Sequence, residues 1–197
     1  DMGKLFDLEA EGYFYTRLQN PTNDAVAAKI ADLEGGTAGM LTSSGQAATF
    51  LAVFNICSAG QNFIAMNNIY GGSINLFSVT MARMGIEVRY MNDKMTDEEV
   101  DALFDENTRL VFGETIANPA LTVLDIRRYA AIAHRHGVPL VVDNTFATPC
   151  LCRPFDFGAD IVTHSTTKYM DGHANVLGGC IVDGSTFDWA ASGKFSE

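Results

Sequence analysis

Lys168 is the residue of this chain that could do covalent chemistry, and it lies among hydroxyl side chains, two histidines and a glycine in the segment His164–His173. The segment follows Asp160–Thr163, a short apolar stretch that predicts a strand. Just beyond a buried strand a lysine can be desolvated, which favours the neutral, nucleophilic amine needed for a Schiff base. An arbitrary loop lysine is more often simply solvated, so Lys168 needs support from other residues.

Asp143 gives that support. It follows the uncharged run Val138–Val142, so its carboxylate comes at the end of a predicted buried strand. A carboxylate there is costly unless it meets a cation or several donors, although a turn or helix cap explains Asp143 alone equally well. Together, Lys168 and Asp143 suggest pyridoxal phosphate, which needs a lysine for its aldehyde carbon and an acid beside its pyridinium nitrogen.

Donors for a cofactor phosphate are also present. Gly45 and Gln46 follow Ser44 at the start of an Ala-rich predicted helix, where free N–H groups and the helix dipole favour an anion. Hydroxyls of the lysine segment could add donors, and Tyr70 could stack on a planar ring. Alone, each signal is weak, because Ser-Gly before a helix is usually a cap and a tyrosine usually packs.

The elements that must position these residues alternate along the chain. Seven stretches predict strands, and they lie at residues 39–41, 62–66, 86–91, 110–112, 138–142, 160–163 and 178–182. Amphipathic helices between them indicate an α/β fold with a mainly parallel sheet flanked by helices, in three αβα layers. The first long helix is capped by Asn20 and predicted to bury Val26, Ile30 and Leu33. Ligands of such folds bind beyond the carboxyl ends of the strands, where the candidate residues fall.

Composition and motif content exclude several classes of function. A net charge of −11 over 197 residues argues against nucleic acid and anionic membranes as partners, and no apolar run is long enough to span a membrane. The four cysteines suggest reduced thiols in a cytoplasmic protein. No metal site is expected, since there is no CxxC motif and His134 and His136 would point to different faces of a helix. Walker A, GxGxxG and GxSxG motifs are missing from the sequence.

Three motifs resemble the Cys/Met-metabolism pyridoxal-phosphate enzymes, in order over nearly the whole chain. They are Ser165-Thr166-Thr167-Lys168-Tyr169 with Gly172-His173, Val141-Val142-Asp143-Asn144-Thr145-Phe146, and Tyr15-Thr16-Arg17 with Asn20-Pro21-Thr22. The resemblance implies the large domain of a fold-type-I enzyme dependent on pyridoxal phosphate (PLP), at residues 21–197. Residues 1–20 would be an N-terminal arm and interface segment. The substrate domain of the family would lie beyond residue 197.

Residue roles follow from the same resemblance. Lys168 would bind the cofactor covalently and shuttle protons, Asp143 would pair with the ring nitrogen, and Tyr70 would stack on the ring and assist proton transfer. The remaining cofactor contacts would be Gly45, Gln46, Ser165 and Thr167 to the phosphate, and Asn118, with Glu114 nearby, at the 3′-oxygen. Tyr15 and Arg17 would reach the cofactor of a neighbouring subunit, which implies a homodimer or homotetramer.

Within the family, three stretches are most similar to O-acetylhomoserine sulfhydrylases. They are Tyr70-Gly71-Gly72 with Asn75-Leu76-Phe77, Leu151-Cys152-Arg153-Pro154, and Phe187-Asp188-Trp189 with Gly193-Lys194-Phe195. This implies γ-replacement on O-acetyl-L-homoserine by sulfide or a thiol, giving homocysteine or methionine and acetate. The alternatives are a methionine or cystathionine γ-lyase, a cystathionine γ-synthase, and a non-catalytic domain that keeps the fold. Because the family's arginine for the substrate carboxylate lies in the further domain, the 197 residues alone are expected to be inactive.

Overall fold

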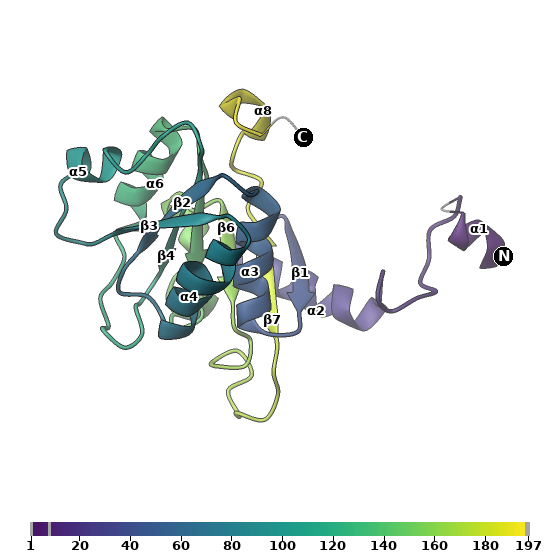
Figure 1. The fold of residues 1–197 in the computed structure, drawn as a ribbon. Helices are drawn as coiled ribbons and strands as arrows, with labels where there is room; N and C mark the ends of the chain where they lie inside the picture. Colours follow the sequence, from purple (N-terminus) through teal and green to yellow (C-terminus); the bar gives the residue numbers. More distant parts are fainter. Residues whose placement is uncertain (1, 8, 196–197) are drawn as a thin grey trace.

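The computed structural model describes residues 2–7 and 9–195 of the chain. Residues 1 and 8 of the predicted arm, and 196 and 197 of the predicted domain, therefore lie outside the described residues. A seven-stranded sheet forms the centre, in the order β1-β7-β6-β5-β4-β2-β3 (Figure 1). Its strands are β1 (Ala38–Thr42), β2 (Asn62–Met66), β3 (Glu87–Met91), β4 (Thr108–Glu114), β5 (Leu140–Asp143), β6 (Ile161–His164) and β7 (Gly179–Asp183).

The predicted mainly parallel sheet is confirmed. β2 to β6 pair in parallel, whereas β7 runs antiparallel to both of its neighbours, β1 and β6. β1 therefore points the same way as β2 to β6, and its carboxyl end joins theirs at one edge of the sheet. In the register, Glu114 at the end of β4 lies opposite Asp143 of β5, which lies opposite Thr163 of β6.

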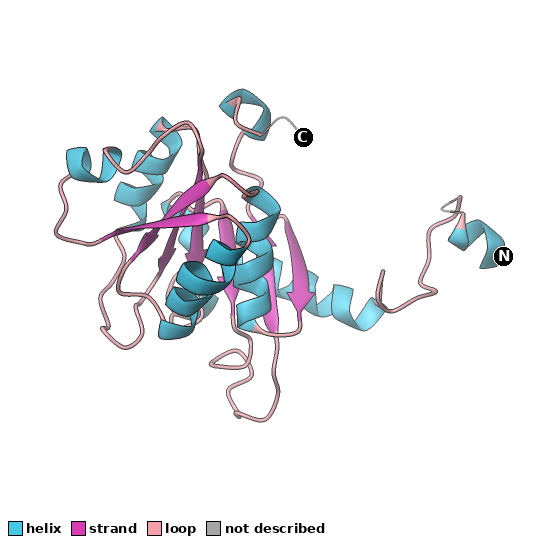
Figure 2. Cartoon of the chain, in the orientation of Figure 1, coloured by secondary structure: helices cyan, strands magenta, loops and turns pink. Residues whose placement is uncertain are grey.

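Helices cover both faces of the sheet, as Figure 2 shows. They are α1 (Met2–Phe6), α2 (Pro21–Glu34), α3 (Gly45–Ile56), α4 (Gly71–Asn75), the π-helix η1 (Leu76–Met81), α5 (Asp97–Asp101), α6 (Ile126–Arg135), α7 (Thr148–Leu151), the 3-10 helix η2 (Pro154–Phe157) and α8 (Trp189–Ser192). α3 packs on β6, β7 and β4. On the opposite face α2 packs on β1 and β7, and α6 on β4 and β5. The three-layer prediction agrees with this arrangement.

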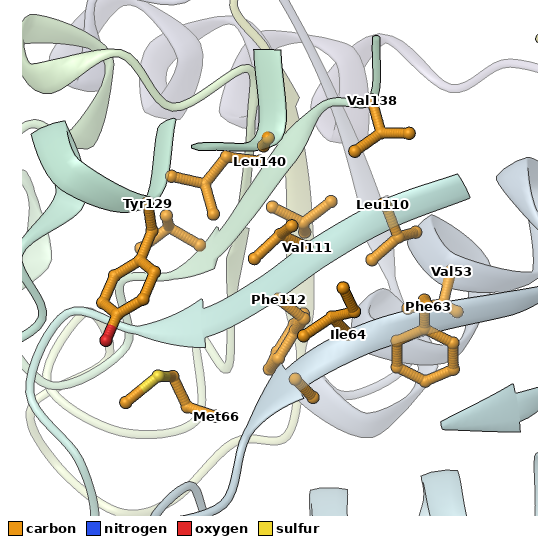
Figure 3. Close-up of a cluster of buried hydrophobic side chains, with 14 of the residues drawn as sticks. Val53, Phe63, Ile64, Met66, Leu110, Val111, Phe112, Tyr129, Val138 and Leu140 are labelled. Carbon is orange, nitrogen blue, oxygen red and sulfur yellow. The ribbon is translucent and has the colours of Figure 1, made fainter. Parts of the chain in front are cut away.

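The core forms where β2, β4 and β5 meet the helices (Figure 3). Phe77 of η1 packs edge-to-face on Phe63 and Phe112, with ring centroids 4.9 Å and 5.1 Å away. These strands read as continuous apolar runs because both of their faces are covered. The rigid core fixes the strand ends, and with them the loops at the carboxyl edge.

Local sequence signals explain the limits of α2. The Asn20 side chain accepts hydrogen bonds from the N–H groups of Thr22 and Asn23, and Gly35 ends the helix with φ +78°. The predicted buried stripe was wrong in two positions, since Val26 and Leu33 are exposed. The helix instead buries its small residues and Glu34, because Ala27 and Ala31 allow a close approach to the backbone of β1 at Gly39.

The segment from Glu11 to Asn20 has no regular secondary structure apart from a turn. It projects away from the sheet, as the purple part of Figure 1 shows. Tyr13, Tyr15 and Leu18 on it are exposed. In residues 2–7 and 9–195, no helix is long and apolar enough to cross a membrane.

Candidate active site

Most of the candidate residues lie at the carboxyl edge of the sheet. Asp143 ends β5, Glu114 ends the neighbouring β4, and Lys168 lies four residues beyond the end of β6. The loop that carries Lys168 leaves the lower end of the sheet in Figure 1. Topology thus places a carboxylate at the end of β5 and an amine in the loop after the adjacent β6, at the edge that the sequence predicts.

The Asp143 carboxylate accepts a hydrogen bond from the N–H of Thr145 at 2.9 Å. Its pKa is raised, because desolvation outweighs the hydrogen bonds from Thr145 and the charge of His164, which both lower it. A desolvated carboxylate of this kind gains from a cationic partner. The structure therefore gives Asp143 the property that the sequence predicts, an acid that is costly without a counter-ion.

Lys168 differs from the sequence expectation in one respect. The sequence suggests that Lys168 can be desolvated, but its side chain is exposed, because the segment folds into successive turns beyond the end of β6. The N–H of Lys168 donates to Ser165 O at 3.3 Å, and the N–H of Gly172 donates to Lys168 O at 2.9 Å. The turns hold the lysine backbone, and its side chain has no hydrogen-bond or ion-pair partner in residues 2–7 and 9–195.

The first turn of α3 packs directly against the lysine segment. A Cβ placed on Gly45 would lie 2.4 Å from the Cβ of Ser165, so no other residue fits there without displacing the backbone. Ser44 caps the helix by accepting the N–H of Ala47 at 3.1 Å. In the part of the chain that the structure describes, this leaves the amides of Gly45 and Gln46 without an acceptor, as is usual for a first helical turn.

Thr167 is engaged with the backbone of the same edge. Its hydroxyl donates to Gly178 O at 3.2 Å and accepts from Gly178 N–H at 3.0 Å. These bonds close the loop between β6 and β7, so Thr167 would have to turn its hydroxyl away from Gly178 O to reach a phosphate. Ser165 is fixed through its backbone, whose N–H donates to the Thr145 hydroxyl at 2.7 Å.

Tyr70 stands beside the start of α3. Its side chain is half exposed, and a Cβ on Gly72 would lie 2.4 Å from its ring and 2.5 Å from Nε2 of Gln46. Gly72 thus allows the Tyr70 ring and the Gln46 amide to approach. Within residues 2–7 and 9–195, the buried Oε1 of Gln46 has no hydrogen-bond partner.

Three predicted residues are less constrained. Asn118 is exposed in the loop after β4, and only its backbone is held, by Glu114. Tyr15 and Arg17 lie on the projecting arm, with the Arg17 guanidinium 5.0 Å from the Tyr15 ring centroid. This chain alone does not bring the arm residues to the carboxyl edge (Figure 1).

The sequence reasoning missed a buried polar network behind Asp143. His164 Nε2 and Glu34 Oε1 are 2.5 Å apart, and both side chains are fully buried. The Asn144 amide donates to the same Glu34 oxygen at 2.9 Å and accepts from the Thr115 hydroxyl at 2.8 Å. The network ties α2 to the residues that follow β5 and end β6. The spacing along α2 indicates that Glu34 lies on the same face as Ile30, but not which side chain it meets.

The donor set at the edge fits pyridoxal phosphate. The two amides at the N-terminus of α3, which have no acceptor among the described residues, suit a phosphate. An exposed amine suits an aldehyde, and a desolvated carboxylate suits a pyridinium nitrogen. Gly45 and Gly72 let Ser165, Tyr70 and Gln46 approach the start of α3, which brings the proposed phosphate and ring contacts together. No three His, Cys, Asp or Glu side chains in the described ranges are placed to hold a metal ion.

A seven-stranded, mainly parallel sheet with this set at its carboxyl edge has the architecture of the large domain of fold-type-I PLP-dependent enzymes. The family model for Cys/Met metabolism PLP-dependent enzymes matches residues 1–197. The chain belongs to that family, as the sequence motifs predict.

Its relatives are consistent with this. The homocysteine/cysteine synthase of Saccharomyces cerevisiae is 47% identical over 94% of this chain and 42% of its own length. The O-acetyl-L-homoserine sulfhydrylase of Leptospira meyeri is 44% identical over 98% of this chain and 43% of its own. A crystal structure of a putative O-acetylhomoserine (thiol)-lyase from Campylobacter jejuni, which contains a pyridoxyl-lysine monophosphate, matches with a TM-score of 0.89 and 37% identity, over 94% of this chain and 45% of that one. The chain therefore spans less than half the length of these relatives.

Proposed function

We propose that the protein is a PLP-dependent transferase that replaces the γ-acetoxy group of O-acetyl-L-homoserine with sulfide or a thiol. The products would be homocysteine or methionine, and acetate. One observation carries the proposal: the amine, the acid and the helix N-terminus that PLP requires lie at one edge of a chain that is 44–47% identical to enzymes named for this chemistry.

In this proposal PLP, when bound, supplies the electron sink for the bonds broken in the substrate. Lys168 would bond to it covalently when no substrate is present and then move protons at Cα and Cβ of the substrate. Asp143 would keep the ring nitrogen protonated, because its desolvated carboxylate is stabilised by that positive charge. Tyr70 would stack on the ring. The proposed phosphate ligands are the amides of Gly45 and Gln46 with the hydroxyls of Ser165 and Thr167, and Asn118 would lie at the 3′-oxygen.

We also propose the division into an arm, residues 1–20, and a PLP-binding domain, residues 21–197. Exposed aromatic side chains on a segment that projects from the domain support a role of the arm in contact with a second copy of the chain. Tyr15 and Arg17 would then complete the partner's phosphate site, in a homodimer or homotetramer. Four free cysteines support a cytoplasmic location.

The substrate assay distinguishes this activity from γ-elimination. We expect the full-length protein to form homocysteine from O-acetyl-L-homoserine only when sulfide is added, because Gly72 stands where methionine γ-lyases usually carry a cysteine. With methionine alone we expect little 2-oxobutyrate. Fast 2-oxobutyrate release from methionine, without sulfide-dependent homocysteine, would show a γ-lyase instead. For residues 1–197 alone we expect little turnover.

Mixing two inactive variants tests the shared site. Arg17→Ala would lack the arm cation and Lys168→Ala the covalent lysine, so each alone should have little activity. In mixed dimers, one site joins the intact Lys168 of one subunit to the intact Arg17 of the other. After co-refolding at equal amounts, homocysteine formation should recover to about a quarter of the wild-type rate, as random pairing in a symmetric dimer predicts. No recovery in verified mixed dimers would mean that Arg17 serves its own subunit.

A further inference from the structure

Glu114 joins two loops of the candidate site. Its Oε1 accepts a hydrogen bond from the backbone N–H of Tyr70 at 2.8 Å, and its Oε2 accepts one from the N–H of Asn118 at 3.2 Å. The two loops follow different strands, β2 and β4, and each carries a side chain proposed to contact the cofactor ring. One carboxylate thus fixes the places where both loops begin.

The carbonyl of Tyr70 accepts from the N–H groups of Ser73 and Ile74, but among the described residues the amides of Tyr70 and Asn118 have no acceptor other than Glu114. Tyr70 lies at the N-terminus of α4, where no side chain caps the helix. Asn118 is exposed, although its neighbour Ala117 is anchored by bonding with Thr122 and Leu121. Hydrogen bonds to an ionised carboxylate are stronger than those to neutral acceptors, so Glu114 is well suited to hold both amides.

The carboxylate is placed there at an energetic cost. Glu114 is 8% exposed, and burial together with the nearby charge of Asp143 raises its pKa to about 7, while the two amides lower it. Glu114 also borders a cavity of about 200 Å³. The other charged or titratable residues that line this cavity are Asp93, Asp125, Arg128 and Tyr129. Arg128 is already bound to Asp97 at 2.7 Å, so it does not neutralise Glu114. Burying Glu114 costs free energy, and its partners are the two amides rather than a cation. The position of Glu114 is therefore best explained by its bonds to those amides.

We propose that Glu114 is a positioning residue, which sets the orientation of Tyr70 and Asn118 toward the cofactor by holding their backbone amides. The inference rests on the proposed function for its consequence, since the two side chains are proposed to meet PLP. The two hydrogen bonds to Glu114 involve only residues of this chain and do not depend on the cofactor. Glu114 does not touch the reacting atoms in this proposal.

The substitution Glu114→Gln tests whether one side chain holds both amides. A glutamine side chain has one acceptor oxygen, and its NH₂ group can only donate, so it can satisfy Tyr70 or Asn118 but not both. We expect at least one of the two amides to exchange its hydrogen about tenfold faster, which corresponds to the loss of one hydrogen bond to a charged group. The dissociation constant for PLP should rise by a similar factor, about tenfold, because the loops must be ordered on binding.

The experiment is amide-resolved hydrogen exchange on the full-length protein, with and without PLP, and a titration of PLP followed by its absorbance. Asp105→Asn is the matched control, because Asp105 is bonded to Asn62, Asn107 and Arg89 beyond the opposite end of β4. It should lower stability without changing exchange at Tyr70 and Asn118 or the affinity for PLP. The N–H of Thr115, which is bonded to Asp143 O, is the internal reference.

The pH profile gives a readout that lost packing would not give. After correction for intrinsic rates, local opening that frees the two amides while Glu114 stays buried should become rarer in the wild type as pH rises through about 7, because the amides bond more strongly to the ionised carboxylate. Glu114→Gln should show no such step. Unchanged exchange at both amides in Glu114→Gln would overturn the proposal. If the wild type does not bind PLP, the proposed function fails, while the exchange data still decide whether Glu114 holds the loops.

Discussion

Lys168→Ala is expected to abolish covalent attachment of pyridoxal phosphate. When the wild-type protein is treated with PLP and then with borohydride, its mass should increase by one reduced cofactor, and peptide mapping should place the addition at Lys168. The variant should take up none at that peptide, because it lacks the amine. Homocysteine formation should fall by at least about three orders of magnitude, as is common when the nucleophile of a covalent mechanism is removed.

The control for this experiment is Lys94→Ala. Lys94 is also an exposed loop lysine, but it follows β3, far along the sheet from β5 and β6. This variant should keep both the covalent label and the activity. Specific labelling that persists in Lys168→Ala, or that moves to another lysine with activity intact, would show that the lysine has been assigned wrongly.

The sheet and the position of the site could be predicted because their causes are local. Phe63–Met66 is a continuous apolar run, and the strand predicted at residues 62–66 has the bounds of β2. Parallel strands bring their carboxyl ends to one edge, so Asp143 and Lys168 had to meet there once the alternation of strands and helices was recognised. The predicted cap at Asn20 depends on neighbours within three residues, and it is present.

What the sequence did not show depends on residues far apart in the chain. Glu34 and His164 are separated by 130 positions, so nothing in either segment indicates that the two side chains meet. The exposure of Lys168 is a property of the loops around it, and the turn pattern alone does not reveal it. The role inferred for Glu114 needed two distances to amides 44 and 4 residues away.

Asp143→Asn is expected to separate stability from function. Burial raises the pKa of the Asp143 carboxyl, so the folded chain keeps its proton to a higher pH than the unfolded chain, whose aspartates titrate near about 3.9. The free energy of unfolding without cofactor therefore falls as pH rises from that value through the folded-state pKa. Asparagine has no charge to desolvate. Without PLP at neutral pH, the variant should therefore be more stable than the wild type.

With PLP present the order should reverse. The wild-type carboxylate would pair with the ring nitrogen, so PLP should raise its free energy of unfolding more than that of Asp143→Asn, and activity of the variant should fall at least about a hundredfold. Urea unfolding with and without PLP measures the free energies of unfolding, and the homocysteine assay measures activity. Asp105→Asn is the control, because its expected effect on the stability of the cofactor-free chain has the opposite sign. Hydrogen bonds from Asn62 and Arg89 lower the pKa of Asp105, so the same change there should destabilise the chain with or without cofactor. If Asp143→Asn instead destabilises the cofactor-free chain as Asp105→Asn does, Asp143 is a structural acid, and its desolvation does not serve the cofactor.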